Sequence, residues 1–412
     1  MNQSKLQEII IDQYKIFQKK DSGFGRLIDT ANKISSSRII VISGVRRSGK
    51  STLLKQISLK LRNFYYINFD DERLIDFTVS DFNNLLILWK KQYQSKNILI
   101  DEIQNVPNWE RFVRRMHDDG YKMFITGPNA KLLSSELSTH LTGLYKRIEL
   151  YPFSFKELLG FYKAPIKKIY SSEEKAKVLK VFDHFIETGG FPEYIKYKEV
   201  DYLKRVYDDI VYRDIIARFG IKKIKSFREL ANYLLTNISK QVSYNSLKNI
   251  LWIKTTMTLR SFVSYLEESY LLFELYKYDF SLKKQYVSDK KIYCIDTGMR
   301  NAVSFHFSSD RGRLLENVVF LELKRREQNL FFYKNKNECD FIVEKKNKII
   351  EAIQVTERLL NTDERQEVGG LIEAMNNFDL KEGLILTEFE SNKIKTGNKI
   401  IKVEPIWKWM IS

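Results

Sequence analysis

The first 150 residues alternate between short, continuous hydrophobic runs and longer segments in which hydrophobic residues recur at helical spacing. Four runs are rich in β-branched and aromatic residues and a fifth is a candidate: 38–43, 64–69, 97–101, 122–126 and 147–150. Continuous apolar runs of this length are typical of strands buried on both faces. The pattern therefore predicts a parallel sheet with helices on both sides.

The segment before the first run has the spacing of an amphipathic helix. Its hydrophobic residues share one helical face: Leu6, Ile9, Ile10, Tyr14 and Phe17. A linker rich in glycine and serine follows at 22–25, and a second helix is expected to reach about residue 33. The start lacks the compact run of a signal peptide, and the longest apolar stretches are much shorter than a membrane span. We therefore expect a soluble cytoplasmic protein with no membrane partner.

Beyond residue 152 helical spacing dominates. Segments 155–162, 173–188 and 201–218 are predicted helices, with a break at 189–192 where two glycines and a proline occur. A second pattern covers 221–290. Three helical segments (226–237, 243–251 and 255–269) precede two segments that alternate like a hairpin (270–280 and 284–287), and 288–291 lead into the next strand. Three helices followed by a hairpin is the order of a winged helix-turn-helix.

Residues 291–412 return to a pattern in which predicted strands and predicted helices are mixed. Helices are predicted at 313–328 and 362–378, and strands at 331–333, 339–344, 349–355 and 382–387. The chain is thus predicted to be an α/β protein of several domains. We expect five parts: an N-terminal helical segment (1–33), an α/β core (34–152), a helical subdomain (153–220), a winged helix (221–290) and a second α/β domain (291–412).

Composition narrows the possible chemistry. Two cysteines and four scattered histidines argue against a disulfide framework and against a transition-metal site. With 69 Lys and Arg against 52 Asp and Glu, the formal net charge is +17. Two explanations stay open: a lysine-rich composition that serves solubility, or a polyanionic partner, with nucleic acid the first candidate.

The segment after the first predicted strand carries a phosphate-binding motif. It satisfies G-x-x-x-x-G-K-[ST] and opens a predicted helix: Gly44, Val45, Arg46, Arg47, Ser48, Gly49, Lys50, Ser51 and Thr52. The two glycines permit turns that aim backbone N–H groups at phosphate oxygens, and the helix N-terminus adds positive potential. Lys50 would reach the β- and γ-phosphates and Ser51 would ligate Mg²⁺. We expect ATP and Mg²⁺ as cofactors.

Two carboxylates and two polar residues complete the predicted site. Asp101 and Glu102 end the third predicted strand, at the edge where α/β sheets bind ligands. We expect Asp101 to hold Mg²⁺ and Glu102 to polarise the attacking water; the alternative is that Glu102 caps the strand. Thr126 ends the next strand, and Asn129 follows it. Either is a candidate sensor of the γ-phosphate, and either could instead cap the loop.

Several motifs resemble a large archaeal and bacterial group of AAA+ ATPases. They cover nearly the whole chain: 44–51, 101–104 with Trp109, 126–127, 141–143, 152–155, 189–193 and the ending 405–409. The group carries a winged helix and a restriction-endonuclease-like C-terminal domain of unknown function. The resemblance implies an AAA+ P-loop core, a helical lid at 153–220, an ATPase that assembles into homo-oligomers, and DNA as partner.

One position departs from that group. The group usually has arginine directly after the glycine that corresponds to Gly143, whereas this chain has Leu144. If that arginine acts as a finger across a subunit interface, hydrolysis activated in trans is in doubt here. Arg147 could substitute for it, or could be a solvated charge at a strand edge.

Residues 221–290 contain the candidate DNA contacts. They carry twelve Lys and Arg against six Asp and Glu. Lys254, Thr255 and Arg260 lie at the start of the third helix, which in such domains faces the bases. Lys283 and Lys284 lie where a wing would contact phosphates. The alternative is that the winged helix is a rigid adaptor between domains.

The last domain has the residue order of a PD-(D/E)xK nuclease with altered chemistry. Glu316 and Asp340 match acidic positions, but the acid-x-Lys position is Gln354-x-Thr356. Glu351 should face away from Gln354, because strand residues three apart point to opposite sides. We therefore expect no metal-dependent nuclease activity.

These patterns predict an enzyme, an ATP hydrolase that drives or switches a conformational change on DNA or on a DNA-bound complex. One alternative is a nucleotide-gated interaction protein with slow hydrolysis, an unidentified protein partner and no DNA role. The other is an ATP-dependent nuclease. DNA-stimulated turnover would favour the ATP hydrolase that acts on DNA. Absence of DNA binding even at low salt would favour the interaction protein, and metal-dependent cleavage would favour the nuclease.

Overall fold

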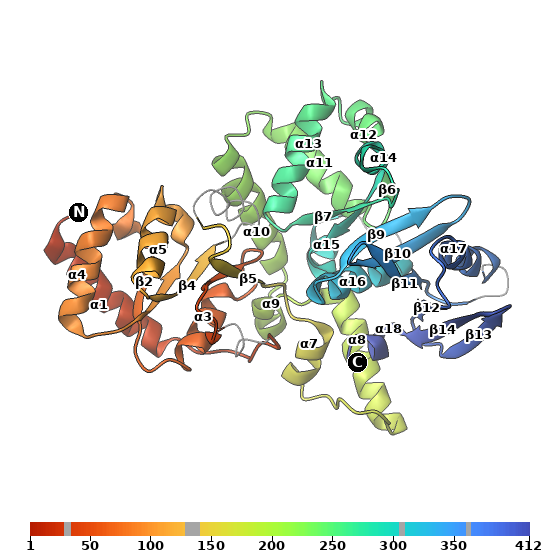
Figure 1. The fold of residues 1–412 in the computed structure, drawn as a ribbon, viewed down its shortest axis with the longest axis horizontal. Helices are drawn as coiled ribbons and strands as arrows, with labels where there is room; N and C mark the ends of the chain where they lie inside the picture. Colours follow the sequence, from red (N-terminus) through yellow and green to blue (C-terminus); the bar gives the residue numbers. More distant parts are fainter. Residues whose placement is uncertain (29–33, 128–140, 305–309, 360–363) are drawn as a thin grey trace. The chain divides into compact units, whose positions relative to one another are not determined.

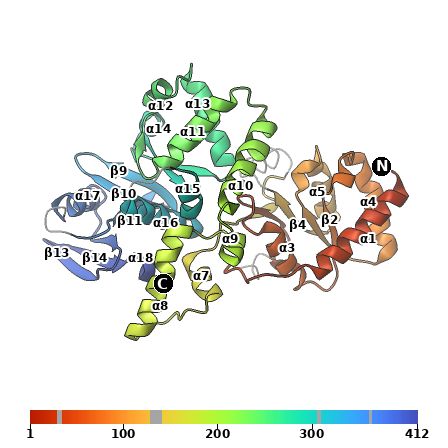
Figure 2. The same cartoon turned by 180° about the vertical axis from the view of Figure 1, so that it is seen from behind.

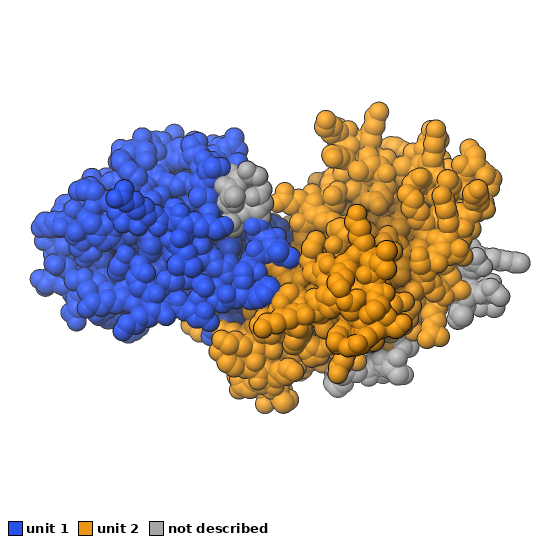
Figure 3. Space-filling view, turned by 90° about the horizontal axis from the view of Figure 1, so that it is seen from below, with its two compact units in different colours: residues 1–151, 268–270 blue, residues 152–267, 271–412 orange. Residues whose placement is uncertain are grey.

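The computed structural model describes residues 1–28, 34–127, 141–304, 310–359 and 364–412 (Figure 1). The chain divides into two compact units, coloured separately in Figure 3. Unit 1 contains residues 1–151 and 268–270, and unit 2 contains residues 152–267 and 271–412. The two units are described separately below. The expected second helix falls mostly on residues 29–33, which lie outside the described residues, and residues 24–28 form no helix.

Unit 1 is built on a five-stranded parallel sheet with the order β2-β3-β4-β1-β5. The strands are β1 (Ile39–Ser43), β2 (Tyr65–Asn68), β3 (Asn97–Asp101), β4 (Lys122–Gly127) and β5 (Tyr145–Glu149). The prediction of a parallel sheet is confirmed, and all five strands lie within two residues of the predicted bounds. Because every residue of β1 is buried, the continuous hydrophobic run is its signature.

Alternate residues of β1 belong to two separate cores. Ile39 and Val41 pack in one core and Ile40 and Ile42 in the other, as the period of two in a strand requires. Four helices supply the other halves of these cores: α1 (Gln3–Lys19), α3 (Lys50–Ser58), α4 (Phe82–Gln92) and α5 (Trp109–Asp118). Short 3₁₀ turns lie at Glu72–Leu74, Val79–Asp81 and Ile103–Asn105. The N-terminal helix is thus part of the unit 1 core.

Unit 2 begins with a helical stretch. It contains α7 (Phe155–Phe161), α8 (Ser172–Thr188), α9 (Pro192–Tyr197), α10 (Tyr202–Asp209) and the π-helix η4 (Ile210–Ala217). Two of these helices start at capping boxes that satisfy the first free N–H groups, Ser154 with Glu157 and Ser171 with Glu174. Local sequence is therefore sufficient to set both starts.

The next segment combines four helices with a small antiparallel sheet (Figure 2). In chain order the elements are α11 (Ile224–Thr236), β6 (Gln241–Val242), α12 (Tyr244–Ile250), α13 (Thr256–Glu268), β7 (Leu272–Tyr276), α14 (Leu282–Val287) and β8 (Lys290–Cys294). The sheet order is β6-β8-β7. The three predicted helices are present.

The strand predicted at 284–287 is wrong, because these residues end helix α14. No residue of α14 is buried, so its alternating residues have no core to face. Four alternating residues are too few to separate strand from helix. Leu282, Lys283 and Lys284 favour helix, and Gln285 Nε2 fixes the turn by donating to Asp279 O at 2.7 Å. The connection between β7 and β8 therefore holds a helix.

The rest of unit 2 is a six-stranded mixed sheet with the order β13-β14-β12-β11-β10-β9. Its strands are β9 (Asn329–Lys334), β10 (Glu338–Lys345), β11 (Lys348–Val355), β12 (Glu382–Thr387), β13 (Asn392–Thr396) and β14 (Lys399–Pro405). The helices are α15 (Thr297–Val303), α16 (Arg311–Arg325), α17 (Glu364–Asn377) and α18 (Ile406–Trp409). Strands β13 and β14 were not predicted; β13 is an edge strand whose residues are nearly all exposed.

Candidate nucleotide site

The loop between β1 and α3 depends on two glycines with positive φ. Gly44 has φ 154°, and a Cβ there would lie 2.1 Å from Leu150 O. Gly49 has φ 97° and is the residue before the first turn of α3. Side chains at these positions would be strained, and at Gly44 would also clash. The glycines predicted from the motif are therefore required by the backbone itself.

Lys50 is buried and its ammonium lies over the loop. Nζ donates to Gly44 O at 3.1 Å and to Val45 O at 3.2 Å. The loop also contains Ser48, whose hydroxyl is buried and makes no hydrogen bond to any described residue. A buried hydroxyl without a partner is costly, so a polar ligand with acceptor oxygens fits this loop.

Arg26 contacts the same loop and was missed by sequence reasoning. Its guanidinium donates to Ser48 O at 2.9 Å and to Tyr151 O at 2.8 Å. It thereby ties the loop to the segment after β5. The only signal in the sequence is one arginine next to a glycine-rich linker, which does not distinguish this contact from a surface charge.

Asp101 and Thr126 lie side by side at the ends of β3 and β4. Asp101 is buried, and Thr126 Oγ1 donates to its Oδ1. Burial and the Glu102 carboxylate raise the pKa of Asp101, against hydrogen bonds from Ser51 and Thr126 that lower it. A buried carboxylate beside the Ser51 hydroxyl has the donor chemistry of a Mg²⁺ site, because both offer hard oxygen ligands.

Glu102 lies directly after the strand in a left-handed conformation, with φ 53°. This is uncommon for a residue other than glycine. Its N–H donates to Thr126 Oγ1 at 3.0 Å, and its Oε2 accepts from Gln104 Nε2 at 2.6 Å. The backbone and the side chain of Glu102 are therefore both held in place, and its carboxylate is oriented by Gln104.

The candidate sensors differ in what the structure describes. The Thr126 hydroxyl contacts Asp101 and the Glu102 backbone, so it organises the two acidic residues. Asn129 lies outside the described residues. Arg147, the candidate replacement for an arginine at position 144, pairs with Glu149 at 2.9 Å and donates to Ser43 Oγ at 3.0 Å. Its guanidinium is thus engaged within unit 1.

Comparison with known proteins assigns the first part of the chain. Residues 36–159 match the family described as AAA domain. Residues 179–310 and 311–408 match two families described as domains of unknown function, DUF8612 and DUF4143. An uncharacterized protein of Methanocaldococcus jannaschii, MJ1544, is 39% identical over 98% of this chain and 95% of its own length. This chain belongs to the same family.

A second relative extends the family to bacteria. An uncharacterized protein of Haemophilus influenzae is 32% identical over 79% of this chain and 85% of its own length. Among solved structures, AMPPCP-bound DnaA from Aquifex aeolicus aligns over 63% of this chain and 88% of that chain, at 14% identity. Its TM-score of 0.27 is too low to support an argument about the site. The AAA domain assignment thus rests on the sequence match and on the parallel sheet with its loop.

The residues proposed to contact DNA lie outside the AAA domain, in unit 2. Lys254 and Thr255 precede α13, Arg260 is in its first half, and all three are exposed. Thr255 Oγ1 accepts the N–H of Thr258 at 3.1 Å, which caps the helix. Lys283 and Lys284 are exposed on helix α14 rather than on a strand. Trp252, just before this group, is 92% exposed and was not singled out from the sequence.

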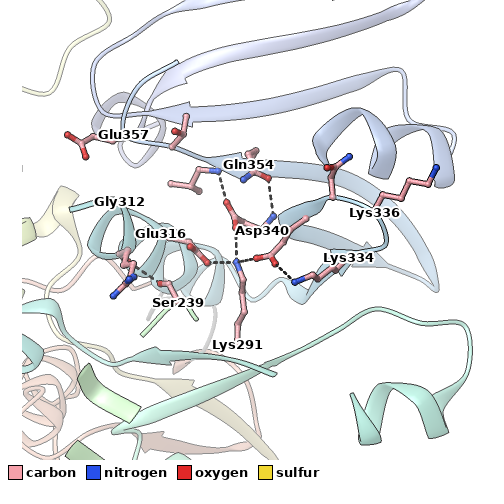
Figure 4. A pocket seen from close by; sticks show the side chains of 14 residues that line it. Ser239, Lys291, Gly312, Glu316, Lys334, Lys336, Asp340, Gln354 and Glu357 are labelled. Carbon is pink, nitrogen blue, oxygen red and sulfur yellow. Dashed lines mark hydrogen bonds and ion pairs between the residues drawn. The ribbon is translucent and has the colours of Figure 1, made fainter. Parts of the chain in front are cut away.

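The nuclease-like positions of the chain converge in a second place. A cavity of about 680 Å³ is lined by Glu316, Asp340, Gln354 and Thr356 together with Lys291 and Glu338 (Figure 4). Burial and the Asp340 carboxylate raise the pKa of Glu316, and the Lys291 ammonium lowers it. Glu351 does not line this cavity, as the alternation of β11 predicts. Sequence reasoning missed Lys291 and Glu338.

Three further expectations can be compared with the described residues. No helix in the described ranges is long and apolar enough to cross a membrane. Cys294 and Cys339 are both buried and free. In the same ranges, no group of three or more His, Cys, Asp or Glu residues is arranged to hold a metal ion.

Proposed function

We propose that this protein binds ATP with Mg²⁺ at residues 44–52 and hydrolyses it, and that turnover drives or switches a conformational change on DNA or a DNA-bound complex. The arrangement of Asp101 and Glu102 beside Ser51 and Thr126 carries the proposal. Asp101 is a buried carboxylate suited to a cation, and the adjacent Glu102 is an oriented carboxylate suited to activating water.

Each residue of the site has a separate task in this proposal. Lys50 exchanges two carbonyl contacts for phosphate oxygens, and Ser51 with Asp101 holds the cation. When bound, Mg²⁺ neutralises charge on the phosphates. Glu102, fixed through Gln104, accepts a proton from the attacking water. Thr126 keeps Asp101 and Glu102 in their relative positions.

The proposal is tested by measuring ATP turnover alone and with single- and double-stranded DNA. The mass of the protein in solution is measured with ATP bound, which reports whether it assembles. We expect turnover that requires Mg²⁺ and rises with DNA. Turnover that is unaffected by DNA, with no DNA binding at low salt, would contradict the DNA part of the proposal only.

A nucleotide-gated interaction protein with slow hydrolysis is the second candidate. Leu144 stands where the resemblance implies an arginine, and Arg147 is engaged with Glu149 and Ser43. Arg147 also donates to the Tyr270 hydroxyl at 2.6 Å, and an arginine with three partners would have to release them to serve a neighbouring subunit. A rate of ATP turnover per protein molecule that does not rise with protein concentration, while ATP still changes partner binding, would favour this candidate.

Lys254→Glu with Arg260→Glu is expected to weaken DNA binding and to flatten its salt dependence. Both side chains are exposed at the start of α13, and each phosphate that the protein no longer neutralises reduces the slope of log affinity against log salt by about 0.9. The measurement is DNA affinity across a salt series. The matched control is Lys222→Glu with Lys225→Glu, which makes the same charge change at exposed residues near the start of α11. Equal weakening in both double variants would show that net charge, rather than α13, determines binding.

Purified protein is expected to leave plasmid DNA uncut in Mg²⁺ or Mn²⁺. The position that bears lysine in active nucleases of this kind is Thr356, and Gln354 is neutral and a weak ligand for a hard cation. The assay is agarose electrophoresis of plasmid after incubation with each cation. Cleavage that disappears in Asp340→Ala would show that the cavity is an active nuclease site.

A further inference from the structure

Lys291 reaches from β8 into a cluster of three carboxylates. Its Nζ lies 2.9 Å from Glu316 Oε1 on α16, 2.6 Å from Glu338 Oε1 and 2.7 Å from Asp340 Oδ1 on β10 (Figure 4). Glu338 and Asp340 are two residues apart on one strand, so their side chains share a face. One cation therefore sits among three acids from two elements.

This arrangement uses every donor that the ammonium has. A lysine ammonium carries three N–H donors, and three carboxylates accept them. The Lys291 side chain is 3% exposed, so the charge is removed from water. Burial alone would lower the pKa of Lys291, but the Asp340, Glu316 and Glu338 carboxylates raise it well above its ordinary value. Lys291 therefore remains charged throughout the physiological range.

The carboxylates are also held by groups other than Lys291. Asp340 Oδ2 accepts the Val355 N–H at 3.0 Å, and Glu316 Oε1 accepts the Tyr293 hydroxyl at 2.6 Å. Glu338 Oε2 accepts from Gln241 Nε2. These contacts hold the three carboxyl groups in place by bonds that do not depend on the ammonium. Their arrangement should therefore persist when the ammonium is removed.

Three carboxylate oxygens around one positive charge is the donor set that a divalent cation takes from a protein. A nuclease of the PD-(D/E)xK kind holds its metal with acids at the positions of Glu316 and Asp340. Here a metal does not fit, because Nζ already occupies the centre. Gln354 does not supply a further acid, and its Oε1 accepts the Asp340 N–H at 3.2 Å.

We propose that the ammonium of Lys291 takes the place of the divalent cation, so that this cavity is a metal-free site that divalent metals cannot enter. The same carboxylates form a divalent-cation site once the ammonium of Lys291 is removed from among them. The inference is independent of the proposed ATPase, since it concerns only residues of unit 2.

The test is Mn²⁺ and Tb³⁺ binding to the full chain without nucleotide. Lys291→Ala removes the charge and also empties the place of Nζ among the three carboxylates. We expect it to bind about one Mn²⁺ with a Kd of about 10⁻⁴ M or tighter, in the range of carboxylate sites of modest charge. Tb³⁺ at the same place should luminesce when tyrosine is excited, because the Tyr293 hydroxyl contacts Glu316. The unsubstituted protein should show neither signal above the background of its P-loop.

Lys290→Ala is the matched control. Lys290 is the neighbouring buried lysine on β8, and its Nζ donates to backbone carbonyls, including Tyr286 O at 2.7 Å. Its removal deletes a buried ammonium without touching the three carboxylates. We expect no new cation site in this variant. The double variant Lys291→Ala with Asp340→Asn should lose the site that Lys291→Ala gains.

Lys291→Ala leaves three acids close together and is expected to melt at a lower temperature that Mn²⁺ raises again. If it fails to fold, Lys291→Ala with Glu316→Gln carries one acid fewer and is measured instead. A folded Lys291→Ala protein that binds no cation would overturn the proposal. The proposal would also be overturned if the unsubstituted protein bound a cation and the Asp340→Asn substitution removed that binding.

Discussion

Glu102→Gln is expected to bind ATP as tightly as the unsubstituted protein and to hydrolyse it about 10²–10⁴-fold more slowly, the usual contribution of a positioned general base. The substitution keeps the size of the side chain and leaves the Glu102 N–H bond to Thr126 intact. It removes the negative charge that accepts the proton. Binding is measured with a fluorescent ATP analogue and turnover by phosphate release.

The control is Glu72→Gln, which makes the same chemical change at an exposed residue of unit 1. This variant should hydrolyse ATP at the unsubstituted rate. Wild-type turnover in Glu102→Gln would remove Glu102 from the mechanism and leave it as a residue that ends β3. Loss of binding together with turnover would instead mean that Glu102 shapes the site before any chemistry.

Lys50→Ala is expected to lower ATP affinity by about 10–100-fold, since a hydrogen bond from a charged donor is worth about 1.5–3 kcal/mol. Because Lys50 Nζ contacts only Gly44 O and Val45 O among the described residues, the fold should not depend on it. The measurement is ATP binding by calorimetry, with the melting temperature recorded without nucleotide.

Lys55→Ala provides the comparison. Lys55 is buried one turn further along α3, and its Nζ donates to Gln18 O at 3.0 Å, away from the loop. It should retain ATP affinity even if its melting temperature falls. An equal decrease of affinity in both variants would show that helix stability, rather than contact with phosphate, explains the Lys50 result.

Much of unit 1 could be predicted from the sequence because its signals are local. Residues of β1 are buried on both faces, so the strand appears as an unbroken hydrophobic run. The phosphate loop is set by Gly44 and Gly49, whose φ values few other residues adopt. Asp101 and Glu102 follow a buried strand directly, which places them at the ligand-binding edge of the sheet.

Other features were decided only by tertiary contacts. Residues 284–287, which end helix α14, were predicted to be a strand from their alternation. The prediction was wrong because four exposed residues carry no information about which face is buried. Strand β13 was missed because its polar residues form an exposed edge that is defined by pairing with β14. Arg26 and Lys291 were missed because their partners lie 22 or more residues away in the chain.

The sequence by itself determined the strands of the core, the helix starts and the phosphate loop, since each depends on neighbouring residues and backbone geometry. Only the tertiary structure decided that a lysine of β8 lies among Glu316, Glu338 and Asp340. The position of a charge relative to acids on other elements is set by packing between distant segments. That packing also decides whether three carboxylates meet a metal or an ammonium of the chain itself.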